Sequence, residues 1–191
     1  VIEQVQNRVE LPEFVKRKPN EEAKFMGLDA QSAQSLVYVV DASGSMLLHL
    51  SAVLDELERS LQALHPEQSF AILFFQKDTA IHVPPKGKLQ SAHGNQIQDA
   101  MEWIRSSGYV IPSGSSNPIA ALRVAVRLNP DVIYLLSENI TGSGKYAIES
   151  SELLEALEKL NPRNVKTGKR QVEINCIEYL TRDPEGAMEQ I

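Results

Sequence analysis

The sequence predicts an α/β fold in which a doubly wound, mostly parallel sheet with one antiparallel edge strand lies between two layers of helices. Two observations predict it. Continuous apolar runs, such as residues 36–40, alternate with segments whose apolar residues recur every three or four positions. The runs also contain β-branched residues and lack polar alternation, which is typical of strands covered on both faces. With 191 residues the chain is long enough for one domain and a short extension.

The first elements follow from local patterns. Residues 1–34 are mostly polar and predict an N-terminal arm, in which residues 23–28 form an edge strand that leads into the core. The main domain is expected over residues 35–191, and its first buried strand over residues 36–41. Leucines spaced by three and four then predict one face of an amphipathic helix: Leu47, Leu50, Leu54, Leu57, Leu61 and Leu64.

The rest of the chain continues the same alternation. Further strands are expected at 69–75, 79–83, 131–137 and 172–179, and helices near 97–104, from Pro118 to 128 and over 153–160. The pair Pro84-Pro85 ends one of these strands, which suits a sheet edge because proline cannot donate to a strand ladder. Residues 184–191 offer only a very short helix, so we expect them to be weakly held.

Composition argues against several functional classes. The net charge is −6, with 42% hydrophobic and 23% charged residues. This balance gives no support to nucleic-acid binding, which usually shows a basic excess. No run approaches the ~18 apolar residues that cross a bilayer, and no signal peptide is recognisable, so we expect no membrane contact by these residues. The cellular location stays open, because a longer parent chain could carry an anchor.

Three oxygen-bearing side chains follow the first strand at alternate positions: Asp41, Ser43 and Ser45. Residues two apart on an extended segment point to the same side, so these oxygens can converge above the strand tip. Oxygen ligands with one full charge suit a hard cation such as Mg²⁺ or Mn²⁺. The alternative is that the same residues form an ordinary turn and helix N-cap.

This D-x-S-x-S pattern, between a buried strand and a helix, resembles the metal-ion-dependent adhesion site of von Willebrand factor type A domains. The order of strands and helices over residues 35–191 is similar to that of this Rossmann-like family. Residues 24–28 resemble a segment that precedes the first core strand in some bacterial members. The resemblance also implies that the family's last helix and strand are incomplete at Ile191.

The resemblance implies two more ligand loops. In the stretch from Gly114 to Leu122, Ser116 stands where the family has a metal-binding threonine, although it would equally serve as a helix cap. In the stretch from Leu135 to Asn139, Glu138 stands where the family has aspartate. Its side chain is one methylene longer and would either bind the metal directly or overshoot it. The implied ligands for Mg²⁺, or for Mn²⁺ or Ca²⁺ in its place, are Asp41, Ser43, Ser45, Ser116 and Glu138.

The expected function is a non-enzymatic module that binds an acidic residue of a partner protein through this metal. The first alternative is a metal-independent scaffold with a degenerate site, which Ser116 and Glu138 favour. The second is a Mg²⁺-dependent phosphoester or nucleotide enzyme using Lys145, although the P-loop pattern fails at both of its ends. Trp103 and Tyr109 flank the second loop and fit either a contact surface or core packing.

Overall fold

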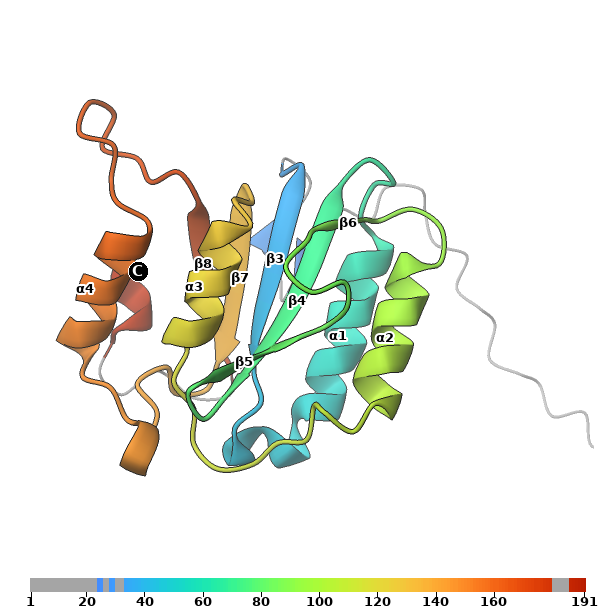
Figure 1. The fold of residues 1–191 in the computed structure, drawn as a ribbon, viewed down its shortest axis with the longest axis horizontal. Helices are drawn as coiled ribbons and strands as arrows, with labels where there is room; N and C mark the ends of the chain where they lie inside the picture. The colour runs from blue at the N-terminus through green and yellow to red at the C-terminus, as the bar shows by residue number, and fades with distance from the viewer. Residues whose placement is uncertain (1–23, 26–27, 30–32, 180–185) are drawn as a thin grey trace, which may run out of the picture.

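The computed structural model describes residues 24–25, 28–29, 33–179 and 186–191. Its main sheet has the strand order β5-β4-β3-β7-β8, and β6 also pairs with β4 (Figure 1). Strands β3, β4, β7 and β8 run parallel, whereas β5 and β6 pair antiparallel with β4. The predicted α/β fold with an antiparallel edge is therefore confirmed. The strands are β3 (Ser35–Asp41), β4 (Ser69–Gln76), β5 (Thr79–His82), β6 (Gln90–Ser91), β7 (Val132–Ser137) and β8 (Glu173–Glu178).

Helices cover both faces of the sheet. Helices α1 and α2 pack with one hydrophobic cluster, and α3 and α4 pack with the other, so the three-layer prediction is confirmed. The α-helices are α1 (Leu50–Gln62), α2 (Gln96–Ser106), α3 (Ile119–Arg127) and α4 (Ser150–Leu160). Three short 3₁₀ helices complete the described elements: η1 (Gly44–Leu48), η2 (Gly144–Tyr146) and η3 (Met188–Gln190).

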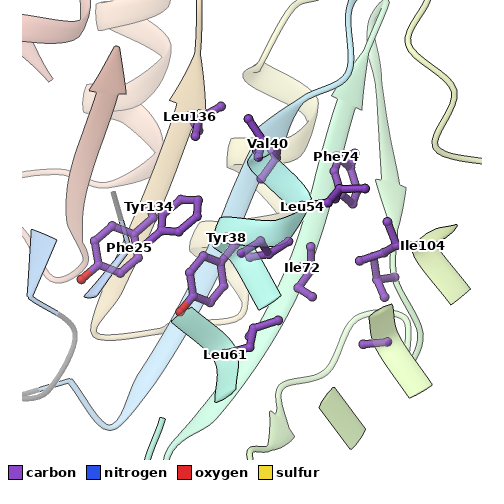
Figure 2. Close-up of a cluster of buried hydrophobic side chains, with 14 of the residues drawn as sticks. Phe25, Tyr38, Val40, Leu54, Leu61, Ile72, Phe74, Ile104, Tyr134 and Leu136 are labelled. Carbon is purple, nitrogen blue, oxygen red and sulfur yellow. The ribbon is translucent and has the colours of Figure 1, made fainter. Parts of the chain in front are cut away.

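The core follows from the two-residue period of the central strand. In β3, Tyr38 and its even-numbered neighbours enter the cluster under α1 and α2, whereas Val37 and Val39 enter the cluster under α3 and α4. Figure 2 shows Tyr38 and Tyr134 side by side, with the ring of Phe25 beside them. The Phe25 and Tyr38 ring centroids lie 5.1 Å apart at an interplanar angle of 88°, an edge-to-face arrangement that aromatic pairs prefer.

The N-terminal segment differs from its predicted role as an edge strand. Within the described residues, β1 (Lys24–Phe25) pairs antiparallel with β2 (Leu28–Asp29) in a separate two-stranded sheet. Phe25 is fully buried and closes one end of the cluster under α1. Because neither strand pairs with the main sheet, the segment covers a face of the sheet and does not extend its edge.

Leu47 also differs from its predicted place on the buried face of the first helix. The α-helix begins only at Leu50, after the 3₁₀ helix η1. The tighter 3₁₀ turn changes the angular spacing of side chains, so Met46 is buried while Leu47 is exposed. The buried helical face therefore starts at Leu50.

The C-terminal residues are better packed than the sequence suggests. Ala187 and Met188 are buried in the cluster under α3 and α4, and η3 lies against β8. These two apolar side chains pack this short turn against the core, whereas the expectation that residues 184–191 are weakly held concerns their dynamics and stays a prediction. The predicted start of the last helix, at residues 183–185, lies outside the described residues.

Candidate functional site

The carboxyl ends of the two central strands meet at one end of the sheet, the lower end in Figure 1. Strands β3 and β7 are parallel neighbours, with Val40 opposite Leu136 in the register. The next residues, Asp41 and Ser137, therefore end their strands side by side. In open α/β sheets this edge is where ligands bind.

Asp41 is a buried carboxylate whose oxygens accept several hydrogen bonds. Oδ1 accepts from the Ser43 amide at 2.7 Å and from the Ser116 hydroxyl at 3.1 Å, and Oδ2 accepts from the Ser137 hydroxyl at 2.6 Å. Burial raises the pKa of Asp41 above the ordinary aspartate value, and these hydrogen bonds only partly oppose that shift. The ionised form of Asp41 is therefore disfavoured by its surroundings, and a nearby cation would favour it.

The remaining predicted ligands line a single crevice of about 320 Å³ above this carboxylate. Ser43 and Ser45 direct their hydroxyls toward each other at an Oγ–Oγ distance of 3.1 Å. The structure thus brings all five predicted residues together, four on the wall of the crevice and Asp41 beneath it. The crevice is lined by Ser43, Ser45, Gly114, Ser115, Ser116, Glu138, Asn139, Gly142 and Ser143.

The Glu138 carboxylate has a buried oxygen atom that bears on whether the crevice can hold a metal ion. Its Oε2 atom is buried and, among the described residues, has no hydrogen-bond partner. Burying a carboxylate oxygen without a partner is unfavourable, and a divalent cation held by oxygen ligands would satisfy it. The donor set of hydroxyls and two carboxylates therefore fits a hard cation. The described residues contain no cluster of three or more His, Cys, Asp or Glu side chains that would hold a metal without the hydroxyls.

Backbone contacts fix the three loops relative to one another. The Gly44 amide donates to the Gly114 carbonyl at 2.7 Å, which ties the first loop to the second. Gly142, on the third loop, has a φ of +66°, and a Cβ there would overlap the Ser116 carbonyl. Only glycine tolerates both the positive φ and the lack of room for a Cβ atom. Gly142 therefore allows the third loop to approach Ser116 this closely.

Three residues that the sequence did not predict also belong to the site: Ser137, Gly142 and Gln76. Ser137 was detectable in principle, because it is a polar residue at the end of a buried strand, as Asp41 is. The Gln76 side chain donates to the carbonyls of Ala42 at 2.8 Å and Ile111 at 2.6 Å, and so links two loops. No local pattern marks that role, since its partners are more than thirty positions away.

Comparison with models of known protein families shows to which family the chain belongs. A model of the von Willebrand factor type A domain matches residues 34–176, which is most of the sequence. The chain belongs to the von Willebrand factor type A family. Members of this family typically bind proteins, are generally non-catalytic, and often hold a divalent metal. A search of curated proteins finds no significant match.

One solved structure shows the same fold at low sequence identity, and a second is a weaker match. A von Willebrand factor type A protein from Catenulispora acidiphila is 17% identical with a TM-score of 0.51, and the match covers 85% of this chain and 41% of that one. A PilB minor pilin variant from Streptococcus sanguinis is 17% identical with a TM-score of 0.41, and the match covers 56% and 30% of the two chains. This chain thus spans less than half the length of either protein.

The residues considered for an enzymatic site or for a contact surface do not line the crevice. Lys145 is exposed on η2, with its Nζ 5.4 Å from the ring centroid of Tyr146, and does not line the crevice. Trp103 is partly buried and packs against the core. Tyr109 is exposed, and its ring stacks on the ring of Trp103. Within the part of the chain that the structure describes, no helix is both long and apolar enough to cross a membrane.

Proposed function

We propose that this domain is a non-catalytic protein-binding module that captures an acidic side chain of a partner through a divalent cation. The cation, Mg²⁺ or in its place Mn²⁺ or Ca²⁺, would be held by the hydroxyls of Ser43, Ser45 and Ser116 and by the carboxylates of Asp41 and Glu138. When bound, it would supply an open coordination position for a carboxylate from outside the domain.

The observation that carries the proposal concerns Glu138, a residue that lines the hydroxyl-bearing crevice: its Oε2 atom is buried and has no hydrogen-bond partner within the described part of the chain. Asp41 supports it from beneath, because its pKa is raised by burial and a nearby cation would oppose that shift. Ser43 and Ser116 hold Asp41 through hydrogen bonds and at the same time present their own oxygens at the crevice. Ser45 is exposed, so its hydroxyl can turn from Ser43 toward a cation.

A second candidate, a metal-independent scaffold of the same fold, is favoured by a different observation. Both oxygens of Asp41 already accept hydrogen bonds, and the hydroxyls of Ser43 and Ser45 bond to each other. A network satisfied in this way is stable without a cation. The two candidates differ in one measurable property, since a ligand that binds only the folded state must stabilise it.

The test is calorimetric titration of Mg²⁺ and Mn²⁺ into metal-free protein, together with thermal unfolding in Mg²⁺ and in EDTA. We expect saturable binding and a higher melting temperature in Mg²⁺. A matched pair of crevice serines provides the control: Ser45→Ala should weaken metal binding about tenfold or more, and Ser143→Ala should leave it unchanged. Equal behaviour of wild type and Asp41→Ala, with no metal-dependent stabilisation in either, would favour the scaffold.

Glu138→Asp distinguishes the two candidates further, because it restores the family's residue in the third loop. If this variant gains a Mg²⁺-dependent stabilisation that the parent lacks, the parent is a scaffold with a degenerate site. A panel of nucleotides and phosphoesters, with Lys145→Ala as control, tests the enzymatic alternative. We expect no turnover with wild type or variant.

A further inference from the structure

Four large apolar side chains are exposed next to the crevice. Leu47 and Leu48 on η1 have exposed fractions of 63% and 86%, and Tyr109 and Ile111 on the loop between α2 and α3 have 69% and 60%. We call these four residues the apolar rim. Among the described residues, the other large apolar side chain with such exposure is Val165, on the loop between α4 and β8. Figure 1 shows that loop at the opposite end of the domain.

Backbone contacts tie the rim to the crevice. Leu48 lies three positions after the proposed ligand Ser45, within the same 3₁₀ helix. Ile111 is held by its carbonyl, which accepts from the side chain of Gln76, and Gln76 also donates to the carbonyl of Ala42, the residue after Asp41. The Ser113 amide donates to that same Ala42 carbonyl at 3.2 Å. Hydrogen bonds thus link the loop of Ile111 to the segment that follows Asp41.

One residue of the rim, Tyr109, packs against a neighbouring aromatic side chain. The Tyr109 ring stacks on Trp103 with centroids 5.7 Å apart and an interplanar angle of 8°. Trp103 in turn packs against the buried cluster under α1 and α2. A pre-ordered aromatic side chain loses little conformational entropy on binding, and such side chains are enriched among the residues that dominate interface energies.

A divalent cation in the crevice would favour an acidic occupant over a basic one. A divalent cation would offset the two carboxylates, Asp41 and Glu138. Two exposed lysines lie on backbone that borders the crevice. Lys77 donates its amide to the Ser115 carbonyl, and Lys145 follows the crevice-lining segment that ends at Ser143. Asp78 follows Lys77 at the tip of the β4–β5 turn and offsets part of this charge.

We propose that the apolar rim and the crevice together bind one short segment of a partner protein, in which an acidic residue is flanked by large apolar side chains. This inference rests on the proposed function, because the acidic residue is the one that the metal site would capture. The rim adds specificity that a carboxylate alone lacks. Exposed large apolar side chains beside a polar site are typical of interaction surfaces.

The experiment is a selection from a displayed library of random peptides, carried out on wild-type protein in Mg²⁺ and repeated in EDTA. We expect enriched peptides to pair an acidic residue with neighbouring Leu, Ile, Val, Phe or Trp, and to be lost in EDTA. Enriched acidic peptides without apolar neighbours would overturn this inference and leave the proposed function standing. Apolar peptides that bind equally well in EDTA, or no metal-dependent peptides at all, would overturn the inference, while the metal titration would still decide the proposed function.

Variants then assign the contacts. Leu48→Ser and Ile111→Ser should each weaken binding of a synthetic enriched peptide about tenfold, while the calorimetric affinity for Mg²⁺ stays at the wild-type value. Val165→Ser is the matched control, because it removes an exposed apolar side chain far from the crevice, and it should change neither quantity. Wild-type peptide affinity in both rim variants would refute the role of the rim.

Discussion

Replacement of Asp41 by asparagine should stabilise the metal-free protein, although it alters the centre of the site. Asp41 is 1% exposed, and burial raises the pKa of its carboxyl despite hydrogen bonds at 2.6, 2.7 and 3.1 Å. The raised pKa means that the surroundings favour the neutral form. Asparagine is neutral and nearly isosteric: its Oδ1 can accept from the Ser43 amide, and its amide group can donate to the Ser137 hydroxyl.

The direction of the pKa shift gives the sign of the effect, because the surroundings of Asp41 favour its neutral form. Charged hydrogen bonds that the variant loses offset part of the gain. We therefore expect Asp41→Asn to raise the free energy of unfolding at pH 7 in EDTA by about 1 kcal/mol, the usual size of a stabilising substitution. In Mg²⁺ the order should reverse, because a cation at ten times its Kd stabilises wild type by about 1.4 kcal/mol and the variant has lost a charged ligand.

The pH dependence has a definite sign. A carboxyl whose pKa is raised on folding contributes stability at pH values below its unfolded pKa, and this contribution is lost as the pH rises through the folded pKa. The advantage of Asp41→Asn in EDTA should therefore grow with pH across that window. Urea unfolding, followed by circular dichroism at several pH values with and without Mg²⁺, measures both effects. A variant about 1 kcal/mol less stable than wild type in EDTA at pH 7 would refute the reasoning.

Four further substitutions, one of them a control, test the packing of the site and core by urea unfolding. Gly142→Ala should destabilise the protein by about 3 kcal/mol or more, because the added methyl overlaps the Ser116 carbonyl at positive φ, whereas Gly144→Ala, at a similar φ in open space, should cost about 1 kcal/mol. Equal losses in the two glycine variants would contradict the overlap. Ser137→Ala should cost about 2 kcal/mol in EDTA, because it removes the 2.6 Å hydrogen bond to the buried carboxylate of β3; a loss under about 0.5 kcal/mol would argue against that bond. Tyr38→Phe should cost about 1 kcal/mol, because it leaves a buried serine hydroxyl on α1 without its 2.9 Å partner, and an unchanged midpoint would contradict this.

Much of the fold was predictable because strands and helices leave short-range patterns. The apolar run at 36–40 gave the central strand, and leucines at three- and four-residue spacing gave α1 from Leu50 onward. Proline at 84–85 marked the edge position of β5. The errors fall where a pattern is too short to carry information, as at Leu47 in the 3₁₀ turn and in the two-residue strands of the N-terminal ribbon.

The sequence by itself determined the chemistry offered at the end of the central strand. One carboxylate and two hydroxyls within five consecutive residues lie near one another whatever the local backbone does, although Ser45 belongs to the 3₁₀ helix η1 and not to the extended segment that the sequence suggested. Ser116 and Glu138 were predicted as site residues only through the resemblance to the family. Their role as metal ligands stays a prediction.

Tertiary structure alone decided which distant groups complete the site. The strand order places β7 beside β3, so Ser137 reaches Asp41 across 96 positions of the chain. The same packing buries one oxygen of Glu138, which has no hydrogen-bond partner among the residues that the structure describes, and it leaves Leu48 exposed. The physical reason is that strand order and loop approach depend on how whole layers pack, and no short window of sequence records that packing.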